Sequence, residues 1–360
     1  MTPASYGPMD RALHRLAFGT LGAQRRLAEI ETRMYQDRIE PDHGRRPVFV
    51  TSLPRAGTTV LLEALAALPE FAAATYRHMP FTLLPLIWTE ATRHFQQEAH
   101  PAERAHGDGV AVGFDSPEAF EETLWMAFWP ERYRDGMIRP WTEATRDEGF
   151  EAFFRTHMAK VVAAGGGEAR RYLSKNNANL ARLPMIAAAF PDATVVVPVR
   201  NPWAQVASLL RQHRRFLDLH AEDAFALRYM QGLGHFEFGA ALKPIAWGTE
   251  PPDPAGADRA EFWLAYWADA YEEALAGAGD RVVVVDHDRL SADPAPHLAA
   301  LAAAVGARPG ADLAAVAAHF RPSRPAEPPE AAPALIRRAR EIHAALQARC
   351  LAPAREAAIP

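Results

Sequence analysis

The chain has 360 residues, a formal net charge of −5 and 49% hydrophobic residues, which suits one large α/β domain with a sizeable core. The slightly acidic balance argues against a general nucleic-acid binder, and the single cysteine, Cys350, excludes a disulfide scaffold and a cysteine-based metal site. The first residues lack the apolar segment of a signal peptide, and no run approaches the length of a membrane span, so we expect a soluble cytoplasmic protein without an integral-membrane partner.

The first half of the chain begins with helical spacing and then changes to a strand followed by a helix. Residues 9–39 have the periodic leucines of a lead-in helix or pair of helices. The valine-rich run at 47–51 is typical of a buried parallel strand, and 58–68 reads as the helix after it. Residues 70–150 are rich in tryptophan and predict helices and loops that cover a cleft, and an amphipathic helix follows at 150–167.

The second half alternates strands with helices. We expect strands at 171–175, 193–200 and 281–290, helices at 179–190, 203–216, 262–276 and 294–305, an irregular stretch at 217–258, and a proline-rich loop with a terminal helix after 320. This alternation predicts a three-layer α/β/α fold around a central parallel sheet. Because there is no clear linker, we expect a single domain over 1–360, with the lead-in helices at 1–40, the cover at 70–150 and the terminal segment at 320–360.

The stretch LPRAGTT, residues 53–59, lies between the first strand and its helix. A glycine turn before a helix directs backbone N–H groups and the positive end of the helix dipole to one spot, and Arg55 adds a permanent charge with a planar fork of donors. We therefore expect a phosphate or sulfate to be held by Arg55, Ala56, Gly57, Thr58 and Thr59. The loop differs from the nucleotide-triphosphatase loop, since Thr58 stands where that loop has lysine. Ordinary threonine capping of a helix is the plainer alternative.

A second anion-binding pattern follows the strand at 193–200. In VVVPVRNPWAQVASLL, Arg200 stands at the strand's carboxyl end, the edge at which open α/β sheets bind ligands, and Ser208 lies on the next helix. Together they are placed to hold a second phosphate. A surface salt bridge after a strand is the alternative for Arg200.

The two motifs, in this order, resemble those of sulfotransferases that use 3′-phosphoadenosine 5′-phosphosulfate (PAPS), in the branch whose loop has arginine, which includes many bacterial members. The resemblance covers about residues 45–306. It implies a P-loop-like fold, PAPS as co-substrate, no metal, and a sulfuryl transfer to a hydroxyl or amine. It also implies that the loop takes the 5′ end of the donor, that Arg200 and Ser208 take its 3′-phosphate, and that Lys175, in YLSKNNANLARLP, approaches the transferring group. A solvated lysine at a strand edge is the alternative for Lys175.

The general base is the point at which this chain departs from the family pattern. Cytosolic members carry a histidine two residues after the equivalent lysine, where this chain has Asn177, which cannot take a proton. In the arginine-loop branch the base is a carboxylate a little over twenty residues after the loop arginine; the matching stretch, TYRHMPF, offers His78, which suits base work at neutral pH. His78 is the favoured base, with rivals at His106, Asp108, Asp115 and Glu121.

The adenine pocket and the acceptor are less defined. Family members close over the nucleotide with a late basic loop, for which FRPSRP offers Arg321 and Arg324, although a proline-rich surface turn is equally compatible. The acceptor stays open between small molecule, glycan and lipid, as does the oligomeric state. Two other functions remain: a P-loop kinase-like enzyme, and a non-catalytic nucleotide-binding protein on a sulfotransferase scaffold.

Overall fold

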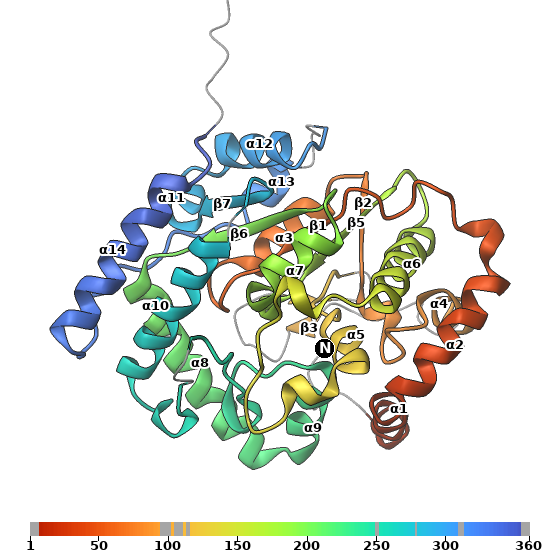
Figure 1. Ribbon diagram of the computed structural model, residues 1–360, viewed down its shortest axis with the longest axis horizontal. Helices are drawn as coiled ribbons and strands as arrows, with labels where there is room; N and C mark the ends of the chain where they lie inside the picture. The colour runs from red at the N-terminus through yellow and green to blue at the C-terminus, as the bar shows by residue number, and fades with distance from the viewer. Residues whose placement is uncertain are drawn as a thin grey trace, which may run out of the picture.

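The central sheet has five parallel strands in the order β2-β5-β1-β6-β7 (Figure 1). The computed structural model describes residues 7–93, 102–103, 111–112, 116–248, 252–277, 279–308 and 313–353. The strands are β1 Val48–Val50, β2 Phe71–Ala73, β5 Arg171–Lys175, β6 Thr194–Val199 and β7 Val282–Asp286, and a separate antiparallel pair joins β3 Ala102–Glu103 to β4 Ala111–Val112. The expected α/β fold with a central parallel sheet is confirmed.

Both faces of the sheet are buried under helices. Successive side chains of β1 point to opposite sides of the sheet, so this strand contributes to the core on each face. Val48 and Val50 pack with Leu61 and Leu65 on one face. The helices on this face are α3 Thr58–Ala66, α11 His287–Ala292, α12 Pro294–Ala304 and α13 Leu313–Ala317. Phe49 points to the other face, where its ring contacts those of neighbouring aromatic residues.

The second face carries the larger core. Its helices are α5 Glu122–Phe128, α6 Glu148–Gly165, α7 Leu183–Ala189, α8 Pro202–Glu222, α9 Ala224–Leu233, α10 Ala260–Gly277 and α14 Pro333–Arg349. Trp125 and Trp141 are fully buried there, so these two tryptophans of the 70–150 segment belong to the core. No helix among the described residues is long and apolar enough to span a bilayer.

The lead-in segment forms two helices, α1 Pro8–Gly19 and α2 Leu21–Met34, of which α1 packs against α9 and α2 lies beside α4 Pro85–Thr92 and α6 (Figure 1). A buried ion pair fastens α2, since Lys160 Nζ lies 2.8 Å from Glu31 Oε2. The other oxygen of Glu31 accepts hydrogen bonds from the backbone N–H groups of Leu86 and Ile87. One carboxylate therefore joins three helices.

Several elements differ from the sequence expectation, among them β2, α9 and β7. Strand β2 has only three residues, too few to show an alternation. Helix α9 lies in the stretch expected to be irregular, and it begins where the Asp223 side chain accepts from the backbone N–H of Phe225. The last strand ends at Asp286, four residues early, because Asp286 caps α11 by accepting from the N–H groups of Asp288 and Arg289.

Candidate active site

The loop predicted to bind an anion connects β1 to α3 and has an unusual backbone. Arg55 has φ +70° and Gly57 has φ +89°, both in the left-handed region. The N-cap residue of α3, Gly57, makes no side-chain cap hydrogen bond, and the positive end of the helix dipole lies at the loop. A Cβ at Gly57 would overlap the His287 ring, so close packing as well as φ requires glycine here.

A side chain of α8 holds the loop through two of its carbonyl groups. Gln205 is fully buried, and its Nε2 donates to the carbonyl oxygens of Leu53 at 3.2 Å and Pro54 at 3.0 Å. Its Oε1 accepts from Trp267 Nε1 at 3.0 Å. Gln205 was not predicted from the sequence, because nothing in a lone glutamine on a helix signals that it supports a loop.

The residues of the two predicted anion motifs meet in one place. Arg55 Nε donates to Ser208 Oγ at 3.2 Å, and Arg200 Nη1 donates to the Arg55 carbonyl oxygen at 2.9 Å. Arg200 Nε donates to Ser323 Oγ at 3.0 Å, which brings the proline-rich segment to the same spot. These groups border a cleft of about 1100 Å³, here called the basic cleft, whose polar lining includes Arg55, Arg200, Ser208, Arg211, His287, His319, Arg321, Ser323 and Arg324.

The charge of the basic cleft comes from its arginines. Burial lowers the pKa of Arg200, whose ordinary value is far above neutrality. Burial, followed by the neighbouring Arg200, lowers the pKa of His287 to about 4, so its ring is neutral at pH 7. His287 Nδ1 is buried and has no hydrogen-bond partner among the residues that the structure describes. His287 was not predicted from the sequence, although its place directly after a parallel strand is a usable signal.

The end of β5 supplies the groups on the other side of the loop. Lys175 is the last residue of the strand, lies in register with Val50, and is buried. Asn177 begins a short 3₁₀ helix two residues later. Thr58 Oγ1 donates to Asn177 Oδ1 at 3.4 Å, and Asn177 Nδ2 donates to Glu237 Oε1 at 2.9 Å. Asn177 therefore joins the start of α3 to a carboxylate that the sequence analysis did not single out.

Asn177 and Glu237 line a second, narrow space of about 40 Å³, here called the small cavity. Its other lining residues are mostly apolar and include Leu53, Pro54, Ile138, Phe236, Leu242, Ile245, Trp263 and Tyr266, with Glu122, His235 and Lys243 among the polar ones. The small cavity and the basic cleft share no lining residue, yet Pro54 borders the first and Arg55 the second. The anion loop thus stands between the two spaces.

The predicted base, His78, lies in a third hollow that runs along β2 and shares no lining residue with the small cavity. Its Nδ1 accepts from the Thr75 backbone N–H at 2.9 Å. Burial lowers its pKa to about 4. The role of His78 stays a prediction.

The rival bases fall into two groups. Glu121 is buried, and both oxygens are engaged: Oε2 by Ser174 and Oε1 by Trp125 at 2.9 Å and Asn179 at 2.7 Å. Burial raises its pKa. His106, Asp108 and Asp115 lie outside the described residues.

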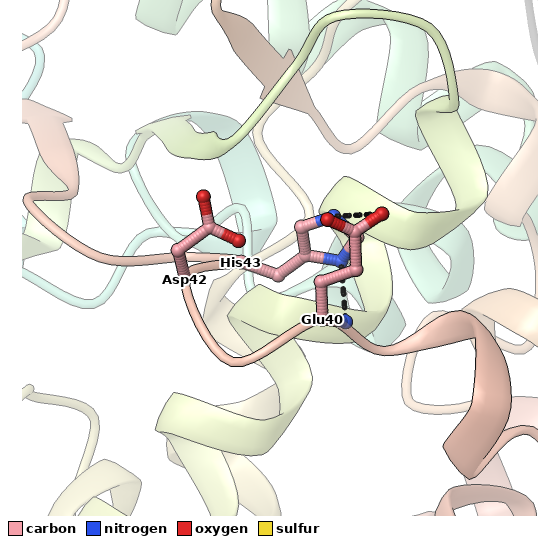
Figure 2. Close-up of side chains that lie close together, drawn as sticks. All are labelled: Glu40, Asp42 and His43. Carbon is pink, nitrogen blue, oxygen red and sulfur yellow. Dashed lines mark hydrogen bonds and ion pairs between the residues drawn. The ribbon is translucent and has the colours of Figure 1, made fainter.

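A cluster of metal-type side chains, Glu40, Asp42 and His43, lies near the amino end of β5, away from these spaces (Figure 2). His43 Nδ1 accepts from the Glu40 backbone N–H at 3.2 Å, which places the ring proton on Nε2, the atom that faces the Glu40 carboxylate at 3.9 Å. Arg170 reaches both carboxylates, at 3.6 and 3.8 Å. These contacts therefore help to hold the turn before β1 against the start of β5.

Comparison with known proteins identifies the family. A family model described as "Sulfotransferase family" matches residues 47–237, which is more than half of the chain. The matched range includes the loop, Arg200, Ser208 and Glu237. No curated protein matches the chain. A sulfotransferase from Mycobacterium avium has the same fold, with a TM-score of 0.55 and 14% identity over 97% of this chain and 88% of that one.

Two further solved structures are less similar. A sulfotransferase from Mycobacterium tuberculosis H37Rv has a TM-score of 0.45 and 16% identity, with 87% of this chain and 88% of that one covered. One from Alicyclobacillus acidocaldarius has a TM-score of 0.38 and 18% identity, with 85% and 94% covered. Because the family model matches more than half of the chain, including the loop and Arg200, the chain belongs to the sulfotransferase family.

Proposed function

We propose that the protein transfers a sulfuryl group from PAPS to a small-molecule acceptor. The observation that carries this proposal is the meeting of Arg55 with Ser208 and Arg200 across 3.2 and 2.9 Å, although they lie far apart in the sequence. The two phosphate ends of PAPS match a cleft with the loop at one end and Arg200 with Ser208 at its side. The five arginines around the cleft, Arg55, Arg200, Arg211, Arg321 and Arg324, suit a ligand with several negative charges.

In the proposed mechanism, the α3 amides and Arg55 hold the 5′-phosphosulfate, and Arg200 with Ser208 holds the 3′-phosphate. The acceptor oxygen attacks sulfur in line with the bridging S–O bond, whose electron pair passes to the 5′-phosphate as that bond breaks. Arg55 and Lys175 stabilise the charge that grows on the bridging oxygen. Arg321 closes the cleft over the nucleotide, and no step is assigned to a metal ion.

A thermal-shift experiment tests the nucleotide specificity. Adenosine 3′,5′-bisphosphate at a hundred times its Kd is expected to stabilise the chain by about 2.7 kcal/mol, which is several degrees in Tm, whereas ATP with Mg²⁺ at the same concentration gives a smaller shift. A larger shift with ATP would contradict the proposal and favour a kinase-like enzyme. Transfer of ³⁵S from labelled PAPS to an acceptor separates catalysis from nucleotide binding alone.

A further inference from the structure

Asn177 places a carboxylate beside the start of the anion loop. Its amide accepts from Thr58 on one side and donates to Glu237 on the other. Helix α9 ends at Gly234 with φ +78°, and the chain then passes along the small cavity through residues 235–237. Only one amide therefore separates Glu237 from the first residue of α3, where the transferring group is proposed to be held.

Glu237 differs from the other carboxylate in the small cavity. Glu122 is fully engaged, with Arg182 on both oxygens and with Tyr133 and Asn176 as further donors. Glu237 uses Oε1 for Asn177, and Oε2 has no hydrogen-bond partner among the residues that the structure describes. That oxygen is left to take a proton.

Two of the remaining polar groups of the small cavity, His235 and Lys243, are committed elsewhere. His235 Nε2 lies 2.9 Å from the Ala119 carbonyl oxygen, so it carries the ring proton. Lys243 Nζ donates to the Tyr133 carbonyl oxygen at 2.7 Å and lies over the Phe236 ring. An acceptor with many hydroxyls would lose its hydration here without gaining partners, which disfavours binding.

The cavity walls define the kind of acceptor. Around Glu237 the lining is formed by aliphatic and aromatic side chains such as Ile245 and Trp263. The space of about 40 Å³ holds about three water molecules, so it takes a hydroxyl and the few carbon atoms next to it. An alkyl ammonium would pair with the carboxylate and has no lone pair with which to attack sulfur.

We propose that Glu237 is the general base and that the acceptor is a neutral alcohol on an apolar carbon chain. This inference rests on the proposed PAPS-dependent transfer. As the acceptor oxygen forms its bond to sulfur, its O–H proton passes to Glu237 Oε2. The S–O bond to the 5′-phosphate breaks and leaves adenosine 3′,5′-bisphosphate, the alkyl sulfate and a protonated Glu237, which returns its proton to solvent.

This assignment replaces His78 as the base and explains why Asn177 can stand where other members of the family have histidine. Asn177 cannot take a proton, but it orients a side chain that can. It is a positioning residue in this scheme, so its loss should lower kcat while leaving nucleotide affinity in place.

The test uses the full chain with ³⁵S-labelled PAPS and two probe acceptors, 1-hexanol and glucose, with adenosine 3′,5′-bisphosphate affinity measured by calorimetry in parallel. The wild type is expected to sulfate 1-hexanol and not glucose. Glu237→Gln keeps the shape and should lower kcat at least ~100-fold with unchanged nucleotide affinity. Asn177→Ala should lower kcat about tenfold with unchanged nucleotide affinity. Glu273→Gln, on the exposed face of α10, is the matched control and should behave as wild type.

Each outcome bears on a different claim. Full turnover in Glu237→Gln, or loss in His78→Asn or His235→Gln while Glu237→Gln stays active, would overturn the base assignment. Nucleotide binding with transfer to neither probe, or to glucose alone, would overturn the acceptor class but leave the donor site standing. Absence of nucleotide binding in the wild type would instead contradict the proposed function itself.

Discussion

The basic cleft and the small cavity lie on two sides of one loop and are built in different ways. The cleft takes Arg200 and His287 from positions directly after β6 and β7, and Arg55 from the loop after β1. The small cavity takes residues 176–178 from the end of β5 and Leu53 with Pro54 from the loop after β1, but draws most of its wall from other loops and helices, among them residues 234–237. A parallel sheet aligns its strand ends by itself, whereas the cavity depends on how several distant segments pack.

The largest effect is expected at the point where the loop touches the cleft. Gly57→Ala forces a left-handed φ on alanine and drives its Cβ into the His287 ring, so adenosine 3′,5′-bisphosphate affinity should fall by more than ~100-fold and the free energy of unfolding by about 1–3 kcal/mol. Calorimetric titration and urea unfolding measure the two effects.

Gly136→Ala is the matched control for this substitution. Gly136 also has a positive φ, +72°, but no atom lies near the position of its added Cβ. It should therefore show the conformational penalty without loss of nucleotide affinity. Equal behaviour of the two variants would show that the packing of His287 against the loop does not matter.

A smaller effect is expected from removing the charge that is assigned to the 3′-phosphate. Arg200→Ala should weaken adenosine 3′,5′-bisphosphate binding by about 2 kcal/mol, roughly 30-fold, because one charge-assisted pair is lost. Binding of adenosine 5′-monophosphate, which lacks the 3′-phosphate, should change far less. Arg228→Ala, on the exposed side of α9, controls for net charge. A variant that still prefers the bisphosphate as strongly as wild type would move the 3′-phosphate elsewhere.

The smallest effect is expected at His78, which lines neither the basic cleft nor the small cavity. Burial lowers its pKa from 6.5 to about 4, so between these values the unfolded chain binds a proton that the folded chain does not. Its contribution to stability is therefore present above pH 6.5 and falls as the pH drops toward 4.

His78→Asn keeps an acceptor for the Thr75 N–H but does not titrate. The loss of unfolding free energy between pH 7 and pH 5 should shrink by about 2 kcal/mol in this variant. Urea unfolding at the two pH values measures it. An unchanged pH dependence would mean that His78 is not buried as a neutral ring.

The sequence predicted the sheet and the cleft because both are encoded locally. Val48 to Gly57 is a continuous strand and turn, and Arg200 with Ser208 is a strand end and one helix face. Glu237 has no such signal, since it follows the end of α9 in a stretch that looked irregular. Its neighbours Asn177 and Tyr266 come from distant parts of the chain. His78 was chosen for its distance along the chain from Arg55; it lies in a hollow along β2 that shares Glu63 and Pro117 with the basic cleft, and its role stays a prediction.

Gln205 bears on how the proposed nucleotide would bind as well as on how the loop is held. Through this one amide, the carbonyl groups of Leu53 and Pro54 are tied to the indole of Trp267, which is fully buried in the core. The loop cannot open by itself without breaking hydrogen bonds that reach into the core, so we expect it to keep its conformation without a ligand. The proposed nucleotide would find its binding groups already ordered, and little of its binding energy would be spent on organising them.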